Sequence, residues 1–189
     1  VTELVLRGIF LFDQHEIDWL YKEGGASSVY PDGWDSFVEI IPEEERGDLV
    51  EAYYRRLTSD DREVQLTAAK AWSRWEGETV TLLPSSEVIE EFTEPHKAVA
   101  VARIENHYMR NGGWLDEGQL LRGAEKLRGI PGVIVQGRHD MCTPPVAAWR
   151  LHKAWPQAEL VIVPDGGHLY NEPGVLDGLI RATDRFADA

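Results

Sequence analysis

The stretch Pro131–His168, PGVIVQGRHDMCTPPVAAWRLHKAWPQAELVIVPDGGH, decides the expected fold. Two short apolar runs, Gly132–Gln136 and Glu159–Val163, predict strands, and the segment from about Pro144 to Trp155 predicts a helix between them. A strand–helix–strand unit favours parallel pairing of its strands. The sequence therefore predicts an α/β fold with an open parallel sheet.

An acid and a histidine follow these two strands. Asp140 comes just after the first strand and His168, behind a Gly-Gly turn, just after the second. Since parallel strands end at one edge of the sheet, where such folds place their sites, we expect the two side chains to touch. Their order is the second half of the Ser–Asp–His order of α/β-hydrolases, with Asp140 orienting His168 as the base. His139 is a poorer candidate base, and we interpret Cys142, on the loop of the acid, as a pocket-wall residue.

The nucleophile expected with this pair is absent from the 189 residues. The closest approach to a G-x-S-x-G motif, Gly25–Val29, lacks the second glycine and follows no apolar strand. A glycine loop for an oxyanion hole is absent as well. The chain has no initial Met and opens directly into a strand at Thr2–Arg7, expected to be buried on both faces. We therefore expect the C-terminal part of a longer protein, inactive by itself.

A long helical block separates the first strand from the other two. Helices are expected at Glu16–Glu23, Trp34–Ile41, Glu43–Leu57, Asp60–Glu78, Ser86–Phe92, Pro95–Arg110 and Gly118–Leu127. We assign residues 1–12 to a core strand, 13–128 to a helical cap domain inserted in the fold, and 129–189 to the C-terminal part of the core. A last amphipathic helix, Val175–Ala187, is expected to cover the sheet with an apolar face of Val175, Leu176, Leu179, Ile180, Thr183 and Phe186.

Two glutamates fall on apolar helix stripes of the cap. Glu76 lies on the side of Val64, Ala68, Ala71, Trp72 and Trp75, and Glu105 on that of Ala98, Val101, Ala102, Tyr108 and Met109. Burying a carboxylate is costly unless it is paired. Each could pair with an arginine, for which Arg7, Arg74 and Arg103 are candidates. Together, facing one pocket, they would instead hold a substrate ammonium, with Trp72, Trp75, Tyr108 and Trp114 as aromatic walls.

Composition narrows the class of protein. The net charge is −14, from 33 acids and 19 bases, which argues against a nucleic-acid surface. No apolar run approaches the ~18 residues needed to span a bilayer, and no signal peptide is visible. The single cysteine excludes an internal disulfide. We expect a cytoplasmic protein without a membrane partner, a metal or a cofactor.

Longer runs resemble the proline iminopeptidases, serine peptidases of the α/β-hydrolase fold that release N-terminal proline. The resemblance covers essentially the whole chain and is carried by Val1–Phe10, Glu16–Tyr21, Pro42–Arg46, Ala71–Glu76, Ile104–Tyr108, Gly137–Asp140 and Gly166–His168. The chain departs from the family at Leu20, where an aromatic residue is common, and at His139, where a tyrosine is common.

The resemblance implies roles for individual residues. Asp140 and His168 would be two members of the triad, and Glu76 and Glu105 would bind the N-terminal ammonium of a peptide substrate. Phe10 would line the proline pocket near Arg7, with Cys142 as a further pocket residue. The strand at Val1–Arg7 would come just after the nucleophile, so the partners would be peptides with a free N-terminal proline and the missing N-terminal part of the same enzyme.

Two alternatives remain at this point. One is another capped α/β-hydrolase, such as an esterase or an epoxide hydrolase, with the cap glutamates paired to arginines around an apolar pocket. The other is a non-catalytic protein that uses an α/β-hydrolase-like fold for binding.

Overall fold

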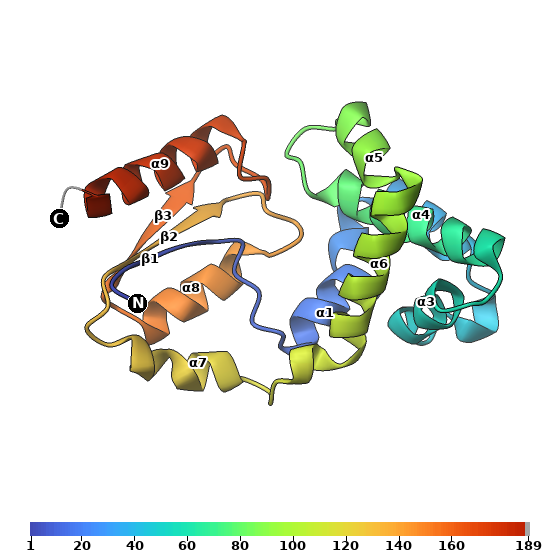
Figure 1. Ribbon diagram of the computed structural model, residues 1–189, viewed down its shortest axis with the longest axis horizontal. Coiled ribbons are helices and arrows are strands. Elements are labelled where there is room, and N and C mark those ends of the chain that lie inside the picture. The colour runs from blue at the N-terminus through green and yellow to red at the C-terminus, as the bar shows by residue number, and fades with distance from the viewer. Residues whose placement is uncertain (188–189) are drawn as a thin grey trace. The chain divides into compact units, whose positions relative to one another are not determined.

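The computed structural model describes residues 1–187 and divides into two compact units (Figure 1). One unit holds the strands and contains Val1–Leu11, Val80–Leu82 and the chain from Glu117 onward. The other is helical and contains Phe12–Thr79 and Leu83–Asp116. The domain boundaries expected from the sequence stay a prediction; the end of the last domain, residues 188 and 189, lies outside the described part.

The sheet consists of three parallel strands in the order β1-β2-β3. They are β1 (Leu4–Arg7), β2 (Gly132–Gly137) and β3 (Ala158–Val163). In the register, Gly137 at the end of β2 is the partner of Val163 at the end of β3. Every residue of β2 is buried, as expected for a central strand. β1 is only half-buried along its length, because within residues 1–187 it pairs with β2 alone.

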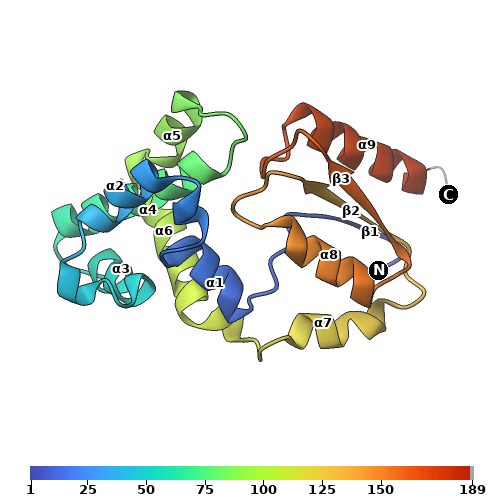
Figure 2. The ribbon, with the colours of Figure 1, turned by 180° about the vertical axis from the view of Figure 1, so that it is seen from behind.

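Helices cover both faces of this sheet (Figure 2). On one side, α8 (Pro145–Ala154) packs with α7 (Gln119–Gly123) and the 3-10 helix Ala124–Leu127 against a cluster that includes Ile134. On the other side, α9 (Pro173–Ala187) packs on Val133 and Val135. Ile134 faces one side of the sheet and Val133 and Val135 face the other, because successive side chains of a strand point to opposite faces.

The buried face of α9 is narrower than expected. Val175 and Ala182 are buried, whereas Leu176 and Ile180, expected on the covered side, are exposed. The contact line runs along Val175, Leu179, Ala182 and Phe186, at intervals of three or four residues. Leu176 and Ile180 each lie one position beyond this line.

The helical unit contains six α-helices and three 3-10 helices within its described residues. The α-helices are α1 (Gln14–Tyr21), α2 (Pro31–Glu39), α3 (Leu49–Leu57), α4 (Arg62–Thr79), α5 (Ser86–Phe92) and α6 (Pro95–Arg110), and the 3-10 helices are Ala26–Ser28, Glu43–Glu45 and Gly112–Trp114. No strand occurs between β1 and β2, as the sequence predicted. None of the helices within residues 1–187 has the length and apolarity required to cross a membrane.

Stacked aromatic side chains form the centre of the helical unit. Tyr21 stacks on Trp72 with ring centroids 4.4 Å apart, and Phe37 stacks on Tyr53 at 4.6 Å. The Tyr53 hydroxyl donates to the Phe37 carbonyl at 2.6 Å, and the Trp75 indole N–H donates to the Leu20 carbonyl at 3.0 Å. Large rings thus fill the core while their polar atoms stay paired.

Proline placement and side-chain capping explain three of the helix starts that differ from expectation. α2 begins at Pro31, three residues before the expected start at Trp34, since proline fits the first helical position. The helix expected over Glu43–Leu57 is interrupted, and α3 restarts at Asp48, whose side chain accepts from the Glu51 N–H at 2.9 Å. α4 begins two residues after the expected start at Asp60, because Asp61 caps it by accepting from the Glu63 N–H at 2.9 Å.

The close approach of Gly132 in β2 to the side chain of Trp155 gives a direct test of the packing around the sheet. A Cβ on Gly132 would lie 2.0 Å from Cη2 of Trp155, which is completely buried. We predict that Gly132→Ala destabilises the protein by about 1–3 kcal/mol through overpacking. Gly123→Ala is the matched control, because no atom lies within 4 Å of its Cβ and its backbone is helical. Thermal unfolding measures both, and equal midpoints would contradict the packing described for Trp155.

Candidate active site

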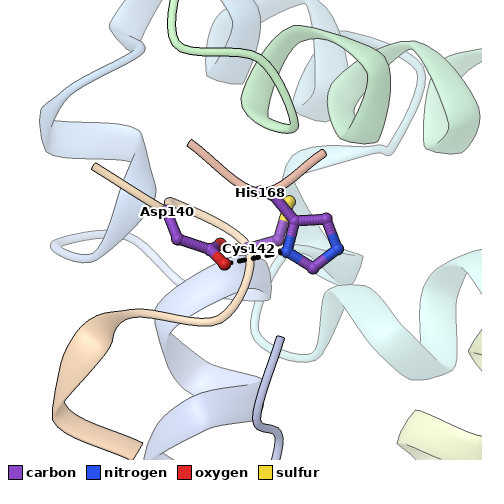
Figure 3. Close-up of side chains that lie close together, drawn as sticks. All are labelled: Asp140, Cys142 and His168. Atoms are coloured by element: carbon purple, nitrogen blue, oxygen red, sulfur yellow. Dashed lines mark hydrogen bonds and ion pairs between the residues drawn. The ribbon is translucent and has the colours of Figure 1, made fainter. Parts of the chain in front are cut away.

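Asp140 and His168 lie in direct contact (Figure 3). Nδ1 of His168 is 3.0 Å from Oδ2 of Asp140 and 3.1 Å from Oδ1. Asp140 is buried, with 1% of its surface exposed, whereas the His168 side chain keeps about one-fifth exposed. Because Nδ1 faces the acid, Nε2 is the nitrogen left for chemistry with a third group.

Main-chain contacts between the two loops produce this arrangement. The Arg138 N–H donates to the Val163 carbonyl, and the His139 N–H donates to the Gly166 carbonyl, each at 2.9 Å. A Cβ on Gly137 would lie 2.0 Å from the Gly167 carbonyl oxygen, so only glycine permits this approach. The side chain of His139 is exposed. The register of β2 and β3 therefore continues into the loops and brings Asp140 to His168.

The turn that carries His168 is held by further groups of the same unit. Arg7 donates from Nη1 to the His168 carbonyl at 2.8 Å, and the His168 N–H donates to the Val80 carbonyl at 3.2 Å. The Glu172 carboxylate accepts from the N–H groups of Gly167 and Leu82. Arg7, expected near a proline pocket, thus binds the backbone of the histidine turn.

Two residues that the sequence analysis did not single out contact the acid. Thr143 donates to Asp140 from its backbone N–H and its hydroxyl, each at 2.8 Å, and the amide of Gln136 donates to it at 3.0 Å. Both left a signal in the sequence. Gln136 is a polar residue in an apolar strand, and Thr143 stands three residues after an aspartate, a spacing typical of side-chain-capped turns.

Cys142 lies beside the pair. Its thiol is buried, and Sγ, a carboxylate oxygen of Asp140 and a ring nitrogen of His168 all lie within 4.8 Å of one another (Figure 3). These are atom types that bind metals, but the oxygens of Asp140 already accept from Thr143, Gln136 and His168. This hydrogen bonding is that of an acid orienting an imidazole.

Phe10, which the resemblance places in a proline pocket, is half-buried in the segment between β1 and α1.

Glu76 and Glu105 form a second cluster inside the helical unit. Glu76 is on α4 and Glu105 on α6, and the indole N–H of Trp72 donates to Oε2 of Glu105 at 3.1 Å. The pKa of Glu76 is raised well above its usual value by burial, then by the charge of Glu105 and a hydrogen bond between the two carboxyl groups; the charge of Lys97 offsets part of this pKa shift. Oε2 of Glu76 is buried and has no hydrogen-bond partner within the described residues.

The arginines considered as partners do not pair with these glutamates. Arg74 pairs with Glu78 at 2.8 Å, Arg7 binds the His168 carbonyl, and Arg103 is exposed. Throughout residues 1–187, neither glutamate of the cluster has an arginine or lysine at ion-pair distance. Two acidic groups therefore lie together, half-buried, with no cation at ion-pair distance, and the charge of Lys97 compensates only in part.

The helix faces around this cluster differ from the expected stripes. On α6 the buried line runs through Ala98, Ala102 and Asn106, whose amide donates to the Val50 carbonyl of α3 at 2.8 Å. Glu105 lies beside this line, so it is half-buried instead of central. Tyr108 and Trp114, 44% and 58% exposed, pack edge-to-face against each other, and Val64 is exposed as well. Of the expected aromatic walls, Trp72 makes the polar contact with the cluster.

Comparison with known proteins identifies the class. The profile of the alpha/beta hydrolase fold matches residues 1–174, so the chain belongs to this family, and the fold expected from the sequence is confirmed. Its relatives include proline iminopeptidases from Xylella fastidiosa (strain Temecula1), 53% identical over 186 residues, and from Arabidopsis thaliana, 51% identical over 188 residues. The proline iminopeptidase of Neisseria gonorrhoeae is 46% identical over 185 residues.

The matches cover nearly all of this chain but only part of each relative. They cover 97–98% of this chain, but 59%, 49% and 58% of the Xylella, Arabidopsis and Neisseria proteins. The chain thus spans about half to three-fifths of the relatives it matches. The resemblance to proline iminopeptidases noted in the sequence is confirmed over that length.

The raised pKa of Glu76 predicts a pH-dependent stability. The folded protein retains a proton at Glu76 that the unfolded chain releases, so this group costs stability as the pH rises above the ordinary carboxyl pKa and through the raised one. We predict that Glu76→Gln raises the unfolding midpoint by roughly 2–4 °C or more at about pH 8 and leaves it nearly unchanged at about pH 4.

Glu90→Gln on α5 is the matched control, since Glu90 is exposed and the same substitution there should leave the midpoint unchanged at both pH values. An equal gain from Glu76→Gln at both pH values would mean that ionisation of Glu76 is not the source of the instability.

Proposed function

We propose that this chain supplies the acid, the base and the amine-binding carboxylates of a proline iminopeptidase. The observation that carries the amine specificity is the Glu76–Glu105 cluster, which is acidic, half-buried and without a basic partner within the described residues. The proline iminopeptidases matched at 46–53% identity support the choice of substrate. The substrates are peptides with a free N-terminal proline.

The acid–base pair would act in acyl transfer. A serine from the rest of the protein attacks the carbonyl of the N-terminal proline, and Nε2 of His168 takes its proton. Asp140, 3.0 Å from Nδ1, fixes the tautomer and stabilises the imidazolium. His168 then gives the proton to the leaving amine, and water hydrolyses the acyl-enzyme by the reverse sequence.

The glutamate cluster would recognise the charged imino group. With one proton held between Glu76 and Glu105, the cluster carries about one negative charge, which matches one ammonium. The unpartnered Oε2 of Glu76 can accept from one of its N–H groups. Neutral esters or epoxides would gain nothing from such a cluster, and the arginine pairs expected for those hydrolases do not form among residues 1–187.

Substitution of Glu105 tests the amine site. We predict that Glu105→Gln raises KM for a proline anilide about tenfold to a hundredfold and changes kcat less, because a charge-assisted hydrogen bond is lost while the bond from Trp72 can persist. Glu90→Gln is the matched control and should behave as wild type. If Glu105→Gln has wild-type kinetics on the anilide, the cluster does not bind the amine.

The source of the nucleophile is tested with the polypeptide itself. We predict that the purified 189-residue chain neither hydrolyses proline amides nor reacts with an active-site serine titrant, because it contains no G-x-S-x-G motif. A full-length protein carrying this chain should do both. Titratable turnover by the 189 residues alone would overturn this assignment.

A further inference from the structure

Gln136 is a buried amide at the end of the central strand. Only 1% of its surface is exposed, and it follows Val133, Ile134 and Val135 in β2. By the two-residue period of the strand it shares a face with Ile134, which packs in an entirely apolar cluster. Packing alone would favour an aliphatic residue there, since an amide is costly to bury unless its polar atoms are paired.

The amide of Gln136 is directed at the loop of the acid. Nε2 lies 3.0 Å from Oδ2 of Asp140, 3.0 Å from the Thr143 carbonyl oxygen and 3.3 Å from the Gly137 carbonyl oxygen. All three neighbours are acceptors, so the reversed amide, with its oxygen facing them, is excluded. Oε1 is buried without a hydrogen-bond partner in the described part of the chain. The side chain is therefore placed for donation to this loop.

The origin of each donor distinguishes Gln136 from the other contacts of Asp140. Thr143 donates twice, but it belongs to the same loop and moves with it. His168 is the group to be oriented, and its Nδ1 lies within hydrogen-bond distance of both carboxylate oxygens. Gln136 is the donor that comes from β2, whose backbone is paired with strands on both sides. Through Oδ2 of Asp140 and the carbonyl of Thr143 it fastens both ends of the loop to the sheet.

We infer that Gln136 is a positioning residue that holds the Asp140 carboxylate in the orientation that meets Nδ1 of His168. The inference rests on the proposed function for its effect on turnover, but the orientation itself does not depend on the substrate. Without this donor the Asp140–Thr143 loop keeps its internal and main-chain bonds and loses the side-chain bonds that tie Asp140 and Thr143 to β2. The carboxylate then meets the imidazole less often, and the imidazolium that forms during acyl transfer is less stabilised.

The experiment uses the full-length protein with Gln136→Leu, Gln136→Glu and the matched control Gln157→Leu, at an exposed position of the same unit. Turnover of a proline anilide is measured against pH, and the Nδ1 proton of His168 is observed by NMR. We expect Gln136→Leu to lower kcat about tenfold to a hundredfold with little change in KM, and to weaken or shift the Nδ1 proton signal. Gln157→Leu should change neither.

Gln136→Glu separates positioning from general destabilisation, and it remains informative if Gln136→Leu does not fold. When protonated, the introduced carboxyl can still donate to Asp140; when ionised, it repels Asp140. We therefore expect the activity of Gln136→Glu, taken as a fraction of the wild-type activity at the same pH, to fall as the pH rises. A merely structural role would give a loss that does not depend on pH.

Two results would overturn the inference: a folded Gln136→Leu protein with unchanged kcat and an unchanged Nδ1 proton signal, or a pH-independent loss in Gln136→Glu. If the wild type does not cleave proline anilides but Gln136→Leu still alters the Nδ1 signal, the proposed function fails and the positioning role stands.

Discussion

The contact between Asp140 and His168 depends on the parallel pairing of β2 with β3. The pairing of Gly137 with Val163 ends both strands at the same level, and the hydrogen bonds from Arg138 and His139 extend it into the loops. The approach leaves no room for a side chain on Gly137. A shift of one residue in this register would separate the acid from the base and turn the apolar side chains of β2 to the wrong faces.

In the helical unit, the polar atoms of the aromatic core are paired, but the acids of the glutamate cluster are not neutralised. In its stacked aromatic core the polar atoms of Tyr53 and Trp75 are hydrogen-bonded, whereas Glu76 and Glu105 bring two acids together with no cation at ion-pair distance. Such a cluster lowers the stability of the fold, and residues kept at a cost in stability commonly serve function. The raised pKa of Glu76 is the direct expression of this cost.

The sequence predicted most of the secondary structure because its signals are local. The apolar strands, the Gly-Gly turn before His168, and Ser86 and Pro95 at helix starts act within a few residues. It also pointed to Asp140 and His168, since parallel strand ends share an edge.

The cap of Asp61 and the break before Asp48 were missed, because several neighbouring acids compete for one capping position. The burial of α6 depends on Asn106 reaching Val50 across 56 residues, which no local pattern contains. Gln136 was passed over because an isolated polar residue does not disturb the pattern of a strand.

The short segment Val80–Leu82 lies in the chain between α4 and α5, yet it belongs to the unit with the strands. Val80 accepts from the His168 N–H, and Leu82 donates to Glu172. The polypeptide therefore passes between the two units four times, at 11–12, 79–80, 82–83 and 116–117. Melting of α4 would release one end of this segment and loosen the histidine turn. A protease cut near residue 80 is accordingly expected to loosen the histidine turn, because it frees one end of the segment that binds this turn.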